Sequence, residues 1–317
     1  MAGSAPPVLC LIGPTASGKS SLAMDLARSR HCGTIEIVNM DSAMVYRGLD
    51  IGTAKPSRQE QSEVRQHLID LVEPTERYSV AQFLTDARKA IDDIRARGHT
   101  PVVVGGTMLY FKALREGLDL LPSCPDHIRV EIEGQARQEG WPVLHAQLTK
   151  VDPQTAARLA PNDAQRICRA LEVWHHTGQT LSSWIAQSQS QPGDRLAGLC
   201  LRVVALMPSD RAWLHARIEQ RFRLMLEHGF LQEVAGLMRH EGLSAHHPSM
   251  RCVGYRQAWA HLSGEIDREA LLRKGIEATR QLAKRQITWL RSFPGLSALE
   301  PRGARWDQLI TVWGSSP

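Results

Sequence analysis

The sequence lacks the features that place a protein in a membrane or in an oxidising compartment. No apolar run among its 317 residues approaches the ~18 residues that a membrane-spanning helix needs. The opening stretch, MAGSAPPVLCLIG, contains no basic segment of the kind that begins a secretory signal. The six cysteines form no C-x-x-C pair, which argues against a disulfide framework and a zinc site. We therefore expect a cytoplasmic monomer without membrane contact, whose cysteines are small buried side chains.

Histidine is plentiful, with 13 residues, but its spacing does not suit metal binding. His175–His176 and His246–His247 are adjacent pairs, whereas two ligands on one helix face stand four residues apart. The sequence also has no H-E-x-x-H motif. We expect no metal site built on histidine.

Positive charge is gathered in two segments, and the net charge is +5. Between Arg273 and Arg291 stand six basic residues and one acid, Glu277. Between Arg211 and Arg223 stand four arginines and one acid. Because a solvated helix usually mixes both signs, these segments indicate contact with a polyanion, either a nucleic acid or a large phosphate ligand.

The first third of the chain alternates strand and helix signals. Apolar, β-branched runs predict buried strands at 8–12, 34–41 and 101–107. Apolar residues at helical spacing predict helices at 19–29 and 79–97. This order predicts an α/β fold, a P-loop-type parallel sheet flanked by helices.

The rest of the chain changes character twice. Only helices are expected from about 126 to 187, followed by a polar linker at 187–194. The later elements are expected as a strand at 196–207, a long helix from Ser209, helices near 253–262 and at 267–291, and a last short strand at 307–312. We therefore expect a catalytic core of residues 1–121 and 199–317, interrupted by an all-helical insertion domain of residues 122–198.

The strongest local motif is GPTASGKS, which fits G-x-x-x-x-G-K-[ST] between a strand and a helix. Such loops are typical of ATP-binding and other nucleotide-binding proteins, because their backbone N–H groups bind phosphate oxygens. Lys19 would add a positive charge over the terminal phosphates, and the Ser20 hydroxyl would bind Mg²⁺. The predicted phosphate site comprises Gly13, Pro14, Thr15, Ala16, Ser17, Gly18, Lys19 and Ser20.

Two further strand ends carry candidate chemistry. Asp41 ends the second strand and should face the same crevice as Lys19, because ligands bind outside the carboxyl ends of parallel strands. It could bind Mg²⁺ through water or act as a general base. The third strand ends in Gly105, Gly106 and Thr107. A P-loop ATPase usually carries a metal-holding aspartate there, so its absence disfavours ATP hydrolysis.

Taken together, these segments resemble the tRNA dimethylallyltransferase family, also called tRNA isopentenyltransferases. The similarity runs in family order from about residue 8 to 291 and is most specific at its C-terminal blocks. The matching segments are GPTASGKS, DSAMVYRGLDIGTAKP, HLID, VGGTMLYFKAL, PNDAQRICRALEVW, RFRLML, RCVGYRQAW and ATRQLAKRQITWLR. Two positions depart from the commonest pattern, Met44 and Gln66, and neither removes a charged catalytic group.

The resemblance implies transfer of a dimethylallyl group from dimethylallyl diphosphate to N6 of adenosine 37 in tRNAs, with Mg²⁺ as cofactor. It implies that residues 13–20 hold the donor diphosphate and that Asp41 takes the proton of the adenine amine. Because negative charge grows on the leaving diphosphate, we also expect a catalytic arginine, either Arg221 or Arg223.

The resemblance further implies a surface that contacts the anticodon stem-loop of the tRNA, with Thr107 and Arg129 near the target nucleotide. The residues expected to contact tRNA are Asp41, Ser42, Ala43, Met44, Thr107, Arg129, Gln165, Arg166, Ile167, Cys168, Arg169, Arg251, Cys252, Val253, Gly254, Tyr255, Arg256, Lys284, Arg285, Gln286 and Arg291.

Two other functions stay open at this point. A P-loop small-molecule kinase would explain residues 1–110 but not the basic helices near the C-terminus. A nucleic-acid-binding module that grips backbone phosphate with its loop would explain the charge, but it would leave Asp41 without a role.

Overall fold

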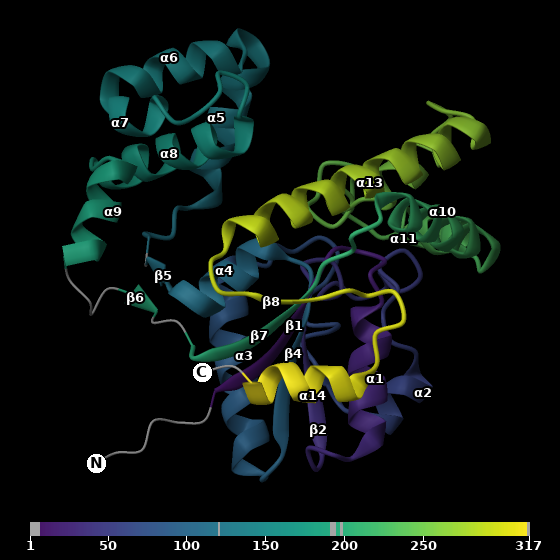
Figure 1. Cartoon of the computed structure of the whole chain (residues 1–317). Helices are drawn as coiled ribbons and strands as arrows, with labels where there is room; N and C mark the ends of the chain where they lie inside the picture. The colour runs from purple at the N-terminus through teal and green to yellow at the C-terminus, as the bar shows by residue number, and fades with distance from the viewer. Residues whose placement is uncertain (1–6, 120, 191–194, 197–198, 316–317) are drawn as a thin grey trace. The chain divides into compact units, whose positions relative to one another are not determined.

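The computed structural model describes residues 7–119, 121–190, 195–196 and 199–315 (Figure 1). The chain divides into two compact units. The larger unit comprises Met1–Glu116 with Gly198–Pro317, and the smaller unit comprises Gly117–Ala197. The smaller unit therefore begins and ends slightly earlier in the chain than the insertion of 122–198 expected from the sequence. No helix in the described ranges is long and apolar enough to cross a membrane.

A parallel sheet of six strands forms the centre of the larger unit. Its strands are β1 (Val8–Ile12), β2 (Ile35–Met40), β3 (Gln66–His67), β4 (Thr100–Gly105), β7 (Leu201–Leu206) and β8 (Ser297–Leu299). Their order is β3-β2-β4-β1-β7-β8, and every pair is parallel. Because β1 lies between β4 and β7, the loops that follow β1 and β4 meet at one edge of the sheet.

Helices cover both faces of this sheet (Figure 1). On one face α1 (Lys19–Ser29) and α14 (Trp306–Ser315) bury Leu26, Leu309 and Trp313 against the strands. On the other face lie α3 (Val80–Ala96) and α4 (Met108–Glu116). The short helix α2 (Arg58–Glu63) precedes β3. The layers are those of the predicted α/β fold.

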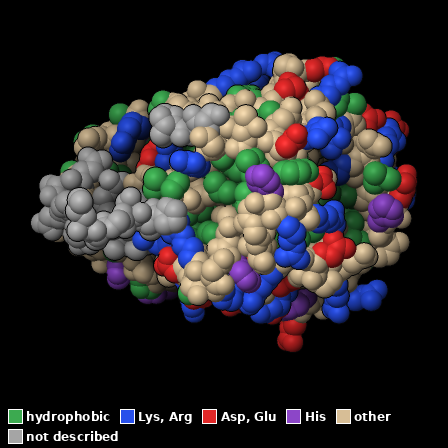
Figure 2. Space-filling model, turned by 60° about the horizontal axis from the view of Figure 1, so that its bottom comes forward, with side chains coloured by type: hydrophobic (Ala, Val, Ile, Leu, Met, Phe, Trp, Pro, Cys, Tyr) green, Lys and Arg blue, Asp and Glu red, His purple; other side chains and the backbone are tan. Residues whose placement is uncertain are grey.

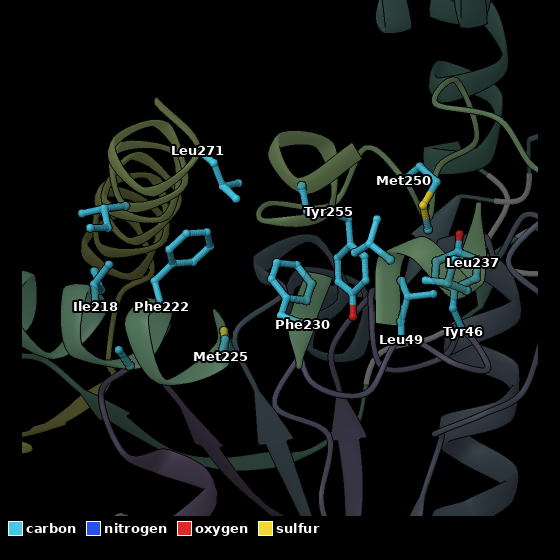
Figure 3. Packing of buried hydrophobic residues seen from close by; sticks show 14 of the residues in the cluster. Tyr46, Leu49, Ile218, Phe222, Met225, Phe230, Leu237, Met250, Tyr255 and Leu271 are labelled. Carbon is cyan, nitrogen blue, oxygen red and sulfur yellow. The ribbon is translucent and has the colours of Figure 1, made fainter. Parts of the chain in front are cut away.

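Four more helices pack together beside the carboxyl ends of the strands. They are α10 (Arg211–Glu227), α11 (Phe230–Leu237), α12 (Tyr255–Leu262) and α13 (Arg268–Ser292). Phe222, Phe230 and Tyr255 form the centre of their core together with Leu49 from the loop after β2 (Figure 3). The rings of Phe230 and Tyr255 meet edge to face at 5.1 Å, a favoured aromatic geometry. This core fixes the loop after β2 against α11 and α12.

In its described residues the smaller unit is helical apart from one short strand pair, and it has its own core. Its helices are α5 (Asp126–Glu139), α6 (Trp141–Val151), α7 (Pro153–Ala156), α8 (Ala164–Thr177) and α9 (Leu181–Ser190). Strands β5 (Leu118–Asp119) and β6 (Arg195–Leu196) pair antiparallel. Leu144, Leu148 and Leu171 are buried in its core, and the Asp152 side chain caps α7 by accepting the backbone N–H of Thr155.

Most predicted elements of the larger unit are present, with three differences. The strand expected at 307–312 is wrong: α14 occupies that segment, because Leu309 and Trp313 are buried four residues apart on one helix face. The last strand is instead β8, which pairs with β7. The helix expected to start at Ser209 is capped one residue later, where the Asp210 carboxylate accepts the backbone N–H of Ala212 and Trp213.

Two smaller expectations also need correction. The linker expected at 187–194 is helical up to the end of α9 at Ser190, and 191–194 lie outside the described residues. Of the six cysteines expected to be buried, Cys10 and Cys168 are, whereas Cys200 is exposed and the others are partly exposed.

Candidate active site

The loop between β1 and α1 has the backbone of a phosphate-binding loop. Ala16 adopts a left-handed conformation with φ 62°, which costs free energy in a residue other than glycine. The carbonyl of Ala16 accepts a hydrogen bond of 2.8 Å from Nε of Arg217 on α10. This hydrogen bond from Arg217 stabilises the strained backbone at Ala16.

A narrow cavity of about 220 Å³ lies over this loop. Its lining includes Thr15, Lys19, Ser20, Asp41 and Arg221. The prediction that Lys19 and Asp41 face one crevice is therefore confirmed. A cavity lined by three cationic side chains, Lys19, Arg217 and Arg221, with backbone N–H groups at a helix N-terminus, suits the phosphate groups of a ligand.

The electrostatics of this cavity follow from burial. Burial lowers the pKa of Lys19 to about 8; nearby Asp41 raises it and Arg221 lowers it further. Lys19 Nζ donates to the Pro14 carbonyl at 3.2 Å. Burial also lowers the pKa of Arg221, whereas the negative charge of Asp41 raises it. Two poorly hydrated cations side by side favour binding of an anion with several charges.

Gln286 of α13 connects the two loops that form the floor of the cavity. Its Oε1 accepts the Thr15 backbone N–H at 2.8 Å, and its Nε2 donates to the Gly106 carbonyl at 2.7 Å. A Cβ at position 106 would lie 2.6 Å from Gln286 Nε2, so this approach requires glycine. The buried side chain of Gln286 thus holds the phosphate loop and also lines the wide cavity that adjoins the narrow one, and its expected contact with tRNA stays a prediction.

The two candidate arginines differ clearly in position. Arg221 lines the narrow cavity and donates from one terminal nitrogen to the Thr53 carbonyl at 3.2 Å. Arg223 is exposed, forms an ion pair of 2.9 Å with Glu219, and lines neither the narrow cavity nor the wide one that adjoins it. Residues two apart on a helix point to different faces. The structure therefore retains Arg221 as the candidate catalytic arginine and removes Arg223.

The wide cavity measures about 460 Å³, and Thr15, Asp41 and Arg221 line both cavities. Its wall is largely apolar, with Ile218, Phe222, Met225, Phe230, Leu282 and Trp289. Asp41 is the only acidic residue among the described residues that line either cavity. Its Oδ1 accepts the backbone N–H of Ala43 at 2.9 Å, so the carboxylate has a defined orientation at the junction.

Thr107 lines the wide cavity. Its hydroxyl oxygen accepts the Ser42 backbone N–H at 3.0 Å. This bond joins the loop after β4 to the loop after β2. Ser42 and Ala43 line the same cavity.

Other predicted site residues of the larger unit separate into two groups. Those that line the wide cavity are Arg251, Cys252, Val253, Gly254, Tyr255 and Arg285. Arg256, Lys284 and Arg291 are exposed and line neither cavity. Met44 is buried and borders only the narrow cavity.

The predicted tRNA contacts of the smaller unit lie on α5 and α8. Gln165 and Arg166 are exposed at the start of α8. Ile167 and Cys168 are buried in the core of that unit, so their side chains are not available to a ligand and the prediction is wrong for them.

Two arginines of the smaller unit share one buried carboxylate. Arg129 and Arg169 both form ion pairs with Glu172, which is 3% exposed. Arg169 also donates to the Pro122 carbonyl at 2.9 Å. These arginines neutralise the buried charge of Glu172. Their contacts thereby hold together α5, α8 and the segment around Pro122 that precedes α5.

Sequence reasoning missed several functional positions. Arg217 stands four residues before Arg221 on α10, and this spacing was the available signal for a second loop-facing arginine. Thr53 lies in the matching segment DSAMVYRGLDIGTAKP, from which only Asp41, Ser42, Ala43 and Met44 were named as site residues. The apolar wall of the wide cavity gave no signal, because its residues come from α10, α11 and α13 and meet only in the folded chain.

Acidic and basic side chains are mixed on one face of the molecule, whereas basic side chains predominate on α13. On the face shown in Figure 2, Lys and Arg side chains lie among acidic, histidine and uncharged ones, as on an ordinary solvated surface. On α13, Arg273, Lys274, Lys284, Arg285 and Arg291 are all exposed. The single-sign segment expected from the sequence thus presents five basic side chains to solvent.

The oxygen atoms that the narrow cavity offers suit Mg²⁺, which needs few protein ligands, better than a metal ion that needs three or more of them. Among the described residues no group of three or more His, Cys, Asp or Glu could hold a metal ion. The narrow cavity offers the Ser20 hydroxyl and the Asp41 carboxylate. Mg²⁺ commonly takes one or two protein oxygens and completes its shell with water and substrate phosphates, so these residues fit it.

A parallel sheet whose phosphate loop opens into an apolar cavity, with one carboxylate at the junction, defines a P-loop-type enzyme that transfers a group from a phosphorylated donor. The family model for IPP transferase matches residues 44–293. The chain belongs to the IPP transferase family. This membership makes it a transferase of the predicted family and removes the kinase alternative.

Individual relatives support the same family. The chain is 57% identical over 297 residues to the tRNA dimethylallyltransferase of Ralstonia pickettii (strain 12J), covering 92% of this chain and 90% of that protein. It is 54% identical over 290 residues to the enzyme of that name from Cupriavidus necator, covering 91% of this chain and 89% of that protein.

Solved structures agree in fold. The full-length tRNA isopentenylpyrophosphate transferase of Bacillus halodurans has a TM-score of 0.66 and 31% identity, covering 97% of this chain and 94% of that one. A eukaryotic dimethylallyltransferase acting on tRNA has a TM-score of 0.77 and 26% identity, covering 97% of this chain and 77% of that one.

Proposed function

We propose that the chain transfers the dimethylallyl group of dimethylallyl diphosphate to N6 of adenosine 37 in tRNAs and releases diphosphate. The observation that carries this proposal is the junction of a cationic narrow cavity with an apolar wide cavity at Asp41. One cavity suits a diphosphate, the other suits a prenyl chain and a base, and the carboxylate stands between them. A tRNA substrate also favours a cytoplasmic location.

The donor diphosphate would bind to the loop of residues 13–20. Backbone N–H groups, Lys19 and Arg221 would stabilise the charge that grows as the bond between C1 of the prenyl group and the diphosphate oxygen breaks. Mg²⁺, held by the Ser20 hydroxyl and phosphate oxygens, would neutralise part of the same charge. The electron pair of the broken bond leaves with the diphosphate.

The acceptor adenine would enter the wide cavity after leaving the base stack of the tRNA. N6 attacks C1 of the prenyl group, and Asp41 accepts the N6 proton as the new bond forms. Thr107, joined to Ser42, lines the wide cavity that the target nucleotide would enter. The apolar wall of Phe222, Met225 and Phe230 would enclose the prenyl group and keep water from intercepting it.

The tRNA body would bind to exposed basic side chains. We assign this role to Arg251, Arg256, Lys284, Arg285 and Arg291, which are exposed on the larger unit. In the smaller unit, Gln165 and Arg166 are available for contact. A polyanion partner accounts for the excess of exposed basic over acidic side chains on α13.

One experiment tests the function directly. The protein is incubated with unmodified tRNA, dimethylallyl diphosphate and Mg²⁺, and the digested nucleosides are analysed by mass spectrometry. One added C5H8 unit on the adenosine next to the anticodon is expected. Transfer of the γ-phosphate of ATP, with no added C5H8 unit, would contradict the proposal.

A further inference from the structure

We propose that Glu233 is a positioning residue for the transfer reaction: it holds the segment 50–53 so that the Thr53 carbonyl orients Arg221 in the narrow cavity. This inference rests on the proposed function, in which Arg221 stabilises the leaving diphosphate. Glu233 lies in the first turn of α11 and lines neither the narrow nor the wide cavity. Its effect therefore passes through other groups.

The Glu233 carboxylate binds four donors with its two oxygens. Oε2 accepts the backbone N–H groups of Asp50 at 3.0 Å and Ile51 at 2.6 Å. Oε1 accepts the backbone N–H of Gly52 at 3.2 Å and the Tyr255 hydroxyl at 2.6 Å. Three successive backbone N–H groups that converge on one anion form a nest, the same kind of arrangement by which a phosphate loop binds its ligand.

The Tyr255 hydroxyl is suited to donate to this carboxylate. Burial and the adjacent Glu233 raise the pKa of Tyr255, so the phenol stays protonated at neutral pH and keeps its O–H donor. The ring of Tyr255 lies beside Phe230 in the core (Figure 3). Glu233 thus ties the segment 50–52 to the aromatic wall of the wide cavity.

The same segment ends at the carbonyl that Arg221 uses. The Thr53 carbonyl accepts a hydrogen bond of 3.2 Å from Arg221. The Thr53 hydroxyl donates to the Leu49 carbonyl at 2.7 Å. The Gly52 N–H is bound to Glu233, and the Ala54 N–H, which belongs to the same peptide group as the Thr53 carbonyl, donates to the Ile51 carbonyl at 3.0 Å. These two bonds fix the direction of the Thr53 carbonyl. An arginine needs such a fixed acceptor if its remaining N–H groups are to point at a phosphate.

Close packing against two aromatic rings holds the segment 50–53 in place. A Cβ at position 52 would lie 2.3 Å from the Phe230 ring and 2.6 Å from the Tyr255 ring. The backbone at Gly52 therefore touches both rings, and a shift of the segment would move the wall of the wide cavity together with the Thr53 carbonyl.

The test is the variant Glu233→Gln, which keeps size and shape but presents an amide NH₂ to backbone N–H groups. We expect kcat to fall by roughly 10- to 100-fold, the scale of a misplaced catalytic group, while KM for tRNA stays unchanged. Glu227→Gln, on the exposed last turn of α10, is the matched control and should behave as the wild type.

The decisive comparison is a double-mutant cycle with Arg221→Ala. In that background, Glu233→Gln should lower kcat by less than roughly threefold, because the group that Glu233 positions is already gone. An equal loss in both backgrounds would mean a general structural role and would overturn the proposal. Unchanged kcat in the single variant would overturn it as well.

A second variant and a binding assay complete the design. Tyr255→Phe removes one of the four donors to Glu233 and should show the same dependence on Arg221, which keeps the test available if Glu233→Gln does not fold. Affinity for inorganic diphosphate, measured by calorimetry, should fall roughly fivefold in Glu233→Gln, the scale of one hydrogen bond, and not in the Arg221→Ala background. Such coupling supports the positioning role even if the wild type prenylates no tRNA, whereas equal affinities in all variants overturn it.

Discussion

Asp41 is the proposed general base, because it is the acidic side chain among the described residues that line the two cavities. Its carboxylate is oriented by the Ala43 N–H and stands beside two cations in the narrow cavity. An ionised carboxylate in this position can accept a proton from a base held in the wide cavity. An asparagine side chain has the same shape, but its amide cannot accept this proton.

Asp41→Asn should therefore lower kcat by roughly 10²- to 10⁴-fold, the usual contribution of a general base. Affinity for tRNA should persist, because the substitution leaves the exposed basic surface intact. Single-turnover prenylation and filter binding measure the two quantities separately. Full turnover by the asparagine variant would show that another group takes the proton.

Arg221 and Arg223 form a natural matched pair on one helix. Arg221→Ala should cost roughly 10²- to 10³-fold in kcat, the scale of removing one donor to developing negative charge. Arg223→Ala should leave the rate unchanged, because Arg223 is exposed and pairs with Glu219. Steady-state kinetics with varied dimethylallyl diphosphate distinguish the two. Equal rate reductions in both variants would contradict the assignment of Arg221.

At the scale of elements, Glu36 joins three parts of the sheet layer far from the site. It lies on β2 and is 2% exposed. His67 of β3 and His99 before β4 each lie 2.6 Å from its carboxylate, and Arg97 at the end of α3 donates at 2.8 Å. Burial raises the pKa of Glu36, but the hydrogen bonds from Arg97, His67 and His99 outweigh it and hold the pKa at about 2.

This network predicts a stability that depends on pH. A depressed carboxyl pKa stabilises the fold above the unfolded value of 4.5, and that stabilisation disappears as pH falls towards 2. The shift corresponds to about 3 kcal/mol of unfolding free energy. Denaturant melts of Glu36→Gln should show lower stability at pH 7 and a flatter decline between pH 5 and 2. A decline as steep as that of the wild type would exclude Glu36 as its source.

The elements also show what local patterns could predict and what they could not. The loop of 13–20, Asp41 and the strands β1, β2 and β4 follow from short segments whose signals are local. The bond of Gln286 to Thr15 could not be predicted because it spans 271 positions, and Glu233 was missed because its three backbone donors lie more than 180 positions away. The segment 307–312 has β-branched residues, which favour a strand. It forms a helix because Leu309 and Trp313, four residues apart, are both buried against α1.

At the scale of the whole molecule, the proposed function requires a cationic surface that binds a polyanion. The exposed basic residues of α13 and the two cavities belong to the same unit. Charge on this surface was predictable from composition alone. The apolar cavity beside it was not, because its wall is assembled from helices that are distant in sequence.

Lys284→Ala with Arg285→Ala should weaken tRNA binding and reduce the salt dependence by ~0.7–0.9 in log–log slope for each phosphate that the variant no longer neutralises. Arg302→Ala with Arg305→Ala, between β8 and α14, is the matched control of equal charge change. Binding isotherms at several salt concentrations give both quantities. An unchanged slope in the first variant would place α13 outside the tRNA interface.

The bond between Gln286 and Thr15 has a consequence for the making of the protein. The phosphate loop leaves the ribosome well before the glutamine that holds it, which follows 271 positions later. At a synthesis rate of 5–20 residues per second, the delay is roughly 14–54 s. During that time the nascent loop lacks its partner, so a chain cut short before α13 cannot complete the donor site. On the proposed function, competence to bind the donor therefore arises only after α13 has been translated.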